Sequence, residues 1–149
     1  MGSLFLVVGH NLAAFGMAAI LAVELALVRP GMSGEEVMRL RRLDSFYGSL
    51  IGLVLFVGIL LVSYSPEGQA FYTENPIFWL KMAAFAAVGI LSILPTVRIY
   101  YWWQAAKDAG FFQAPDDEIA KARKFLRIEA IVFATIPVFS AFTTHGVTS

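Results

Sequence analysis

Four long apolar stretches constrain the fold of this chain more than any other feature of its sequence. They run from Leu4 to Val28, Phe46 to Tyr64, Ile77 to Trp103 and Ile128 to Phe142. About 20 apolar residues in a helix cross a hydrocarbon core of about 30 Å, and the fourth stretch reaches this length when it includes Phe125 and Leu126. The sequence therefore predicts an all-α integral membrane four-helix bundle, a single domain over residues 1–149 with spans at about 4–28, 46–64, 77–103 and 125–142.

A soluble four-helix bundle is the main alternative to this fold. Helices of a soluble bundle carry a polar face at helical period, whereas the stretch from Phe46 to Tyr64 contains no charged residue. The mean hydropathy of +0.71 and the charged fraction of 15% also lie outside ordinary soluble usage. We expect the first stretch to be retained and not to be a cleaved signal peptide, because no Lys or Arg precedes it and Glu24 lies inside it.

The basic residues predict the orientation of the chain in the membrane. Ten of the 11 surround the first and third connections, and these are Arg29, Arg39, Arg41, Arg42, Arg98, Lys107, Lys121, Arg123, Lys124 and Arg127. Lys81 alone lies on the other side. Positively charged loops stay in the cytoplasm, so we expect both termini on the outer, periplasmic side of a bacterial inner membrane. Acidic residues balance the basic loops, so we interpret these loops as orientation signals with at most weak contact to anionic lipids of the bilayer, and we expect no nucleic-acid binding.

Local signals place the helix starts. Ser33 followed by Glu36 matches a capping box, so the second helix is expected to begin before the membrane. Residues 63–76 read as the outer loop, and Asn75-Pro76 opens the third helix. The acidic residues 116–118 suit the start of the fourth helix.

Small residues in the second stretch suggest a packing face. Gly48 and Gly52 form a GxxxG pattern, which lets two helices approach closely. The pattern does not distinguish a partner helix within the chain from one in another copy.

The expected orientation groups the ionisable residues of the spans into two layers. His10 and Lys81 both lie roughly one to two turns below the outer surface at about 1.5 Å of helix rise per residue, and His145 borders the same layer. Near the cytoplasmic ends of the four helices lies a second, buried polar layer of Glu24, Asp44, Arg98 and Glu129. His10 and Glu24 are two heptads apart, so they share one face of the first helix, which we expect to point into the bundle.

Each layer has a structural and a functional interpretation. Lys81 either snorkels outward or faces the bundle beside His10. In the second case Lys81 is the candidate catalytic base, or an anchor for an anion, and His10 can ligate a metal or a heme iron. In the other layer, Arg98 neutralises Glu24 and Glu129, or an unmatched carboxylate moves protons. The absence of cysteine excludes thiolate ligands and disulfides.

Several segments carry a resemblance to known families. The segments "GHNLAAFGMAAILAVEL", "RRLDSFYG", "FYTENPIFWLKMAAF", "ILPTVR" and "RIEAIVFATIP" resemble an uncharacterised family of four-helix bacterial membrane proteins. More distantly, the layout is similar to HemJ-type protoporphyrinogen oxidases and CopD-type membrane domains. The HemJ-type resemblance implies heme b binding and oxidase activity, with His10 and Lys81 at the positions associated with heme. His145, which borders the same layer, is a further cofactor-binding candidate. An alanine-rich run with Glu24 replaces the aromatic and proline pattern that follows the HemJ histidine.

Three functions follow from these observations. The first is a tetrapyrrole-binding protein, with His10 as the axial ligand. The second is a non-enzymatic accessory or assembly subunit, which would pack into a homo-oligomer or a larger membrane complex through Gly48 and Gly52. The third is a small proton-coupled carrier that uses the second polar layer.

Overall fold

The computed structural model describes residues 2–109 and 111–144 of the chain as a bundle of helices. The elements are α1 (Gly2–Leu27), α2 (Gly34–Ser63), α3 (Gln69–Thr73), α4 (Pro76–Ala109) and α5 (Asp116–Thr144). All except α3 are long and apolar enough to cross a membrane. The predicted all-α four-helix membrane fold is confirmed, and α3 is a short helix within the segment expected to be a loop.

The helix starts follow the local chemistry of the chain. At the start of α2, the Ser33 hydroxyl accepts a hydrogen bond from the Glu36 N–H at 3.2 Å, and the Glu36 carboxylate accepts one from the Ser33 N–H at 2.7 Å. This is the predicted capping box. The Asn75 side-chain oxygen accepts from the Ile77 N–H at 2.9 Å where α4 begins, and α5 begins at Asp116, inside the acidic run.

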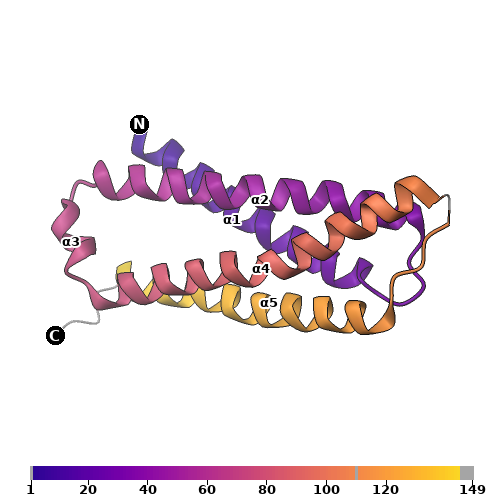
Figure 1. The fold of residues 1–149 in the computed structure, drawn as a ribbon. Coiled ribbons are helices and arrows are strands. Elements are labelled where there is room, and N and C mark those ends of the chain that lie inside the picture. Colours follow the sequence, from indigo (N-terminus) through magenta and orange to yellow (C-terminus); the bar gives the residue numbers. More distant parts are fainter. Residues whose placement is uncertain (1, 110, 145–149) are drawn as a thin grey trace.

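The four long helices form two pairs that converge at one end of the bundle and diverge at the other. Helix α1 packs along α2, and α4 packs along α5 (Figure 1). The pairs meet at the end that carries the α1–α2 and α4–α5 connections, which we call the tight end. They separate at the end where α3 joins α2 to α4, which we call the α3 end. Helix α1 begins and α5 ends at the α3 end.

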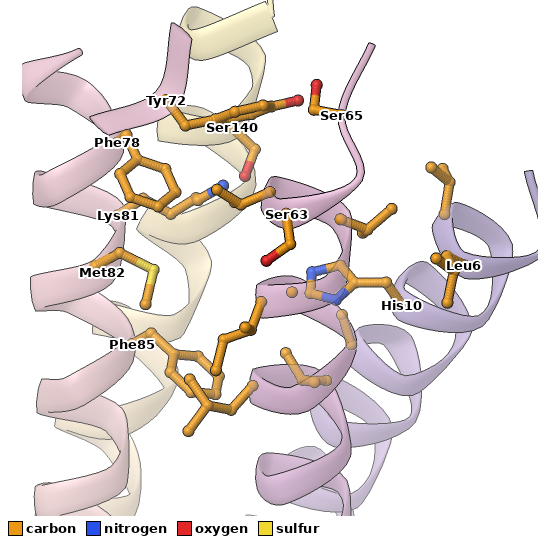
Figure 2. A pocket seen from close by; sticks show the side chains of 18 of the residues that line it. Leu6, His10, Ser63, Ser65, Tyr72, Phe78, Lys81, Met82, Phe85 and Ser140 are labelled. Atoms are coloured by element: carbon orange, nitrogen blue, oxygen red, sulfur yellow. The ribbon is translucent and has the colours of Figure 1, made fainter. Parts of the chain in front are cut away.

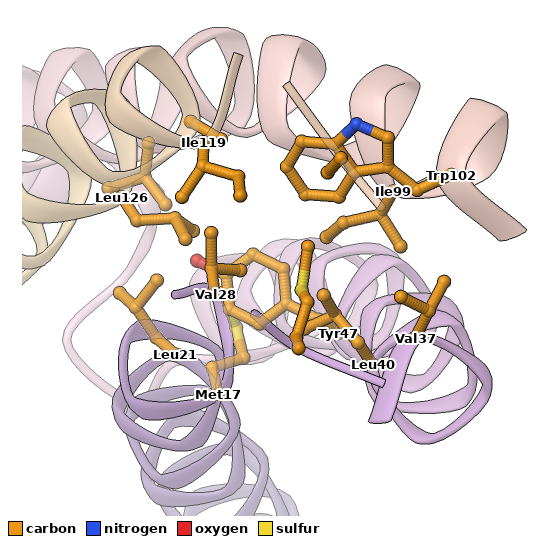
Figure 3. Packing of buried hydrophobic residues seen from close by; sticks show 14 of the residues in the cluster. Met17, Leu21, Val28, Val37, Leu40, Tyr47, Ile99, Trp102, Ile119 and Leu126 are labelled. Carbon is orange, nitrogen blue, oxygen red and sulfur yellow. The ribbon is translucent and has the colours of Figure 1, made fainter. Parts of the chain in front are cut away.

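Buried apolar side chains concentrate toward the tight end. Figure 3 shows a cluster to which all four long helices or their connections contribute, and its members include Met17, Leu21, Val28, Val37, Leu40, Tyr47, Ile99, Trp102, Ile119 and Leu126. Each of these side chains is at most 3% exposed. The contacts between these side chains stabilise the bundle toward the tight end. Fewer buried apolar side chains lie at the α3 end.

A basic side chain closes the end of α1 at the tight end. The Arg123 guanidinium of α5 donates to the carbonyl oxygen of Leu25 at 3.1 Å and to that of Val28. The last carbonyl groups of a helix have no partner within the helix, so a cation there satisfies them and interacts favourably with the helix dipole. Arg123 therefore joins α5 to α1 in addition to its expected role as an orientation signal.

The outward surface of the bundle is apolar. Phe15, Ile90 and Ile131 are 72%, 68% and 68% exposed, and they lie on three different helices. A soluble protein rarely exposes so many large apolar side chains to water, whereas hydrocarbon chains accommodate them. The exterior thus fits contact with the lipid bilayer and disfavours the soluble alternative.

The GxxxG pattern of α2 faces away from the other helices. A Cβ atom added at Gly48 or Gly52 would meet no atom within 4 Å in the described part of the chain. Close contact between α1 and α2 occurs elsewhere, at Gly16, where an added Cβ would lie 3.2 Å from the Leu50 side chain. The GxxxG pattern therefore has no partner among the described residues.

Candidate functional site: a cavity at the α3 end

A cavity of about 640 Å³ opens where the helix pairs diverge. Its wall is largely apolar and includes the aromatic rings of Phe78, Phe85 and Phe133. His10 of α1 and Lys81 of α4 also line it (Figure 2). Pockets for small molecules typically measure about 300–1,000 Å³ and combine an apolar wall with few polar groups. The α3-end cavity has both properties.

One face of α4 supplies a wall of the cavity. Phe78, Lys81, Met82 and Phe85 recur at spacings of three and four residues, which places them on one side of a helix. The Lys81 Nζ atom lies 5.3 Å from the centre of the Phe78 ring, and Figure 2 shows the Lys81 side chain within the cavity. Lys81 therefore faces the bundle and does not extend away from it.

Lys81 has no acidic partner among the residues that the structure describes. No salt bridge joins it to a carboxylate in residues 2–109 or 111–144. Glu67 lies at the cavity wall, but its carboxylate accepts a hydrogen bond from the Ser65 hydroxyl at 2.7 Å. Among the described residues, the Lys81 amine in the cavity is thus not joined to a carboxylate by a salt bridge.

His10 lies against the backbone of α2. A Cβ atom added at Gly58 would lie 3.4 Å from Cε1 and 3.9 Å from Nδ1 of the His10 ring. The Nδ1 atom is buried and makes no hydrogen bond within the described residues. Because Nδ1 is turned toward α2, Nε2 is the ring nitrogen available to a molecule in the cavity.

Gly58 was not identified from the sequence as a site residue. Glycine is frequent in membrane helices, so its presence alone gives no signal. The useful signal is its depth: Gly58 in α2 and His10 in α1 lie near the same end of antiparallel neighbours, and a glycine there makes room for an imidazole.

His10 and Lys81 lie in one cavity but on different walls. Figure 2 shows their side chains across the space from each other, with the side chains of Ser63 and Tyr72 also directed toward it. No hydrogen bond joins His10 to Lys81. A bound molecule could contact both side chains at once. His145, the third residue expected in this layer, lies outside the described residues.

Three acidic residues of the second layer are buried together toward the tight end. Glu24, Asp44 and Glu129 are 2%, 4% and 0% exposed and come from α1, α2 and α5. Asp44 and Glu129 both act electrostatically on Glu24, and Asp44 also acts on Glu129. The layer therefore brings together carboxyl groups from three helices.

Arg98 does not pair with Glu24 or Glu129, contrary to the structural interpretation of this layer. Its guanidinium donates to the Glu118 carboxylate at 3.0 Å. Glu118 lies in the first turn of α5, where its side chain remains 27% exposed. Pairing there keeps both charges partly hydrated and avoids the desolvation that a buried ion pair requires.

A metal site built from several side chains is not found in the part of the chain that the structure describes. No group of three or more His, Asp or Glu residues is suitably arranged there. The polar side chains that line the α3-end cavity include one imidazole, one amine, the Glu67 carboxylate, the Gln69 amide and several hydroxyl groups.

Comparison with known proteins gives a family for the chain. No curated protein and no solved structure matches it. A family model described as "Predicted membrane protein (DUF2214)" matches residues 2–148. This match covers nearly the whole chain and agrees with its four apolar helices. The chain therefore belongs to the DUF2214 family of predicted membrane proteins.

Proposed function

We propose that this membrane protein binds an amphipathic anionic small molecule in the α3-end cavity, and that a tetrapyrrole dicarboxylate, heme b in particular, is the ligand. The observation that carries the proposal is the position of Lys81. Its amine lies in an apolar cavity without an acidic partner among the described residues.

The energetics of Lys81 favour an anionic ligand. A charged side chain is costly inside a membrane protein unless it is paired or hydrated. An anionic group on a bound molecule supplies the missing partner, and the apolar wall buries the rest of that molecule. A tetrapyrrole has both parts, because its carboxylates are attached to a flat apolar ring.

His10 fits the remaining requirement of a heme. The macrocycle supplies four nitrogen ligands to the iron, so the protein needs to provide only an axial ligand. A ligating histidine usually has its other ring nitrogen directed to a backbone or carboxylate acceptor, and Nδ1 of His10 is turned toward the α2 backbone near Gly58. His10 would hold the iron through Nε2, and Lys81 would hold a propionate. These are also the positions that the HemJ-type resemblance associates with heme.

Binding of metal-free protoporphyrin tests the role of Lys81 separately from iron ligation. Exchange of Lys81 for methionine is expected to weaken protoporphyrin binding about tenfold to hundredfold, because hydrogen bonds to charged groups contribute about 1.5–3 kcal/mol. Binding of the dimethyl ester, which has no carboxylate, should be the same in both proteins. Absorbance or fluorescence titration of the detergent-purified protein gives the two dissociation constants.

Lys107→Met is the matched control for this titration. Lys107 lies near the tight end, where its Nζ is 5.4 Å from the centre of the Trp103 ring. This variant should bind protoporphyrin as the wild type does. Equal affinity of the wild type and Lys81→Met for the dicarboxylate would contradict the proposal.

We further propose that the α3 end faces the periplasm and that the protein resides in a bacterial inner membrane. Support comes from the distribution of charge, since Lys81 alone among the 11 basic residues belongs to the α3-end half of the helices. Such asymmetry places the basic end in the cytoplasm.

Cysteine labelling tests this orientation directly, because the chain contains no cysteine of its own. A membrane-impermeant maleimide added to intact spheroplasts should label Glu74→Cys at the α3 end and leave Lys121→Cys unlabelled. Lys121→Cys should react once the membrane is opened. The reverse pattern would contradict the orientation.

A further inference from the structure

The buried carboxyl groups toward the tight end form a site that the ligand cavity does not use. Glu24 and His10 share a face of α1, but Met17 lies between them and is 0% exposed. Met17 lines the inner end of the cavity, and none of the three acidic residues does. The carboxyl cluster, Glu24 with Asp44 and Glu129, is therefore a separate feature.

The three carboxyl groups differ in the number of hydrogen bonds they receive. Asp44 accepts from the Thr96 hydroxyl at 2.6 Å and from the Arg41 guanidinium at 3.3 Å. Glu129 accepts from the Tyr47 hydroxyl at 2.5 Å through Oε1, while its Oε2 is buried without a partner. Glu24 receives no hydrogen bond among the described residues, and its Oε1 is likewise buried.

The positive charges near the carboxyl cluster are engaged elsewhere or reach only Asp44. Arg98 of α4 pairs with Glu118. Arg123 of α5 donates to the carbonyl oxygens at the end of α1. Arg41 of α2 contacts Asp44 and also the Ser45 hydroxyl, at 2.7 Å. Tyr47 and Thr96 are neutral donors, so nothing described in the structure neutralises Glu24.

The ionised form of a buried carboxyl group has a high free energy when no hydrogen-bond donor reaches it, and two acidic neighbours raise that free energy further. A carboxylic acid is neutral and has a hydrogen-bond donor of its own. From the donor count we infer that the carboxyl cluster is a proton-binding site in which Glu24 holds an exchangeable proton at neutral pH, while Asp44 and Glu129 remain its acidic neighbours. Release of this proton places a negative charge beside two other buried carboxyl groups and loosens the packing of α1 against α5.

Infrared spectroscopy of the purified protein tests whether Glu24 carries the proton. The wild type is expected to show a carboxylic-acid C=O band at neutral pH that shifts in D₂O, and Glu24→Gln should lose this band. Glu118→Gln is the matched control, because Glu118 is paired with a cation and accepts from Arg98 at 3.0 Å and from Trp102 at 2.9 Å; this variant should keep the band. A wild-type spectrum without the band, or a band that persists in Glu24→Gln, would overturn the inference.

Thermal unfolding gives a second and independent readout. Glutamine has the shape and neutrality of a protonated glutamate, so Glu24→Gln should fold and match the wild type at acidic pH, where the glutamate is protonated in the folded and the unfolded chain. An unfolded glutamate ionises at about pH 4.3, so the stability that the bound proton provides declines as the pH rises above that value, until the folded protein also releases the proton. The unfolding temperature of the wild type should therefore fall relative to that of Glu24→Gln between acidic and neutral pH. Failure of Glu24→Gln to fold, or parallel pH profiles, would count against a proton on Glu24.

Discussion

Exchange of Gly58 for leucine is expected to weaken ligand binding in the α3-end cavity about tenfold to hundredfold while the bundle still folds. The added Cβ would lie 3.4 Å from Cε1 of His10, and the remaining carbons of leucine would extend into the space beside the ring. Overpacking of this kind costs about 1–3 kcal/mol, and about 1.4 kcal/mol corresponds to a tenfold change in affinity. Leucine favours a helix more than glycine does, so α2 itself should be stable.

Gly48→Leu provides the control, because it makes the same exchange in the same helix. A Cβ at Gly48 meets no described atom within 4 Å, and this variant should bind the ligand as the wild type does. Titration of both variants with heme or protoporphyrin measures the difference. Equal weakening of binding in both variants would contradict a binding site that includes the contact between His10 and Gly58. Unchanged binding in both variants would contradict it as well.

Features set by neighbouring residues were predictable from the sequence. The capping box at Ser33 and Glu36 and the start of α4 after Asn75 depend on atoms within a few residues, and both are present. Helix α3 was not predicted, because the five residues of Gln69–Thr73 are too few to show a helical period.

Contacts between helices were harder to predict. The helix rise placed His10 and Lys81 at a common depth, and they line one cavity. The partner of Arg98 depends on how α4 and α5 are rotated about their axes, which the sequence pattern does not specify, and the expected pairing with Glu24 and Glu129 was wrong. Tyr47 and Thr96 were missed for the same reason, since their hydrogen bonds to Glu129 and Asp44 cross between helices.

Helix α1 connects the two sites that the structure presents. His10 lies at the ligand cavity, and Glu24 lies in the carboxyl cluster further along the same face. Because Met17 separates them and is fully buried, variants of Glu24 are expected to leave the shape of the cavity unchanged. The two proposals can therefore be tested independently.

Loss of His10 is expected to have the largest effect on a bound heme. Coordination by an axial histidine sets the position and intensity of the heme absorption bands, and no second histidine lies in the described part of the cavity. His10→Ala removes the imidazole without adding bulk, so the cavity remains open. Asn11→Ala is the matched control, since Asn11 is the next residue of α1 and is exposed.

The most direct test is the absorption spectrum of the detergent-purified protein after heme-replete expression, recorded in the oxidised and dithionite-reduced states. We predict a Soret band in the wild type and in Asn11→Ala that is lost in His10→Ala. A wild-type spectrum without a Soret band would contradict tetrapyrrole binding in the cavity, and a band that survives the loss of His10 would contradict its role as the axial ligand.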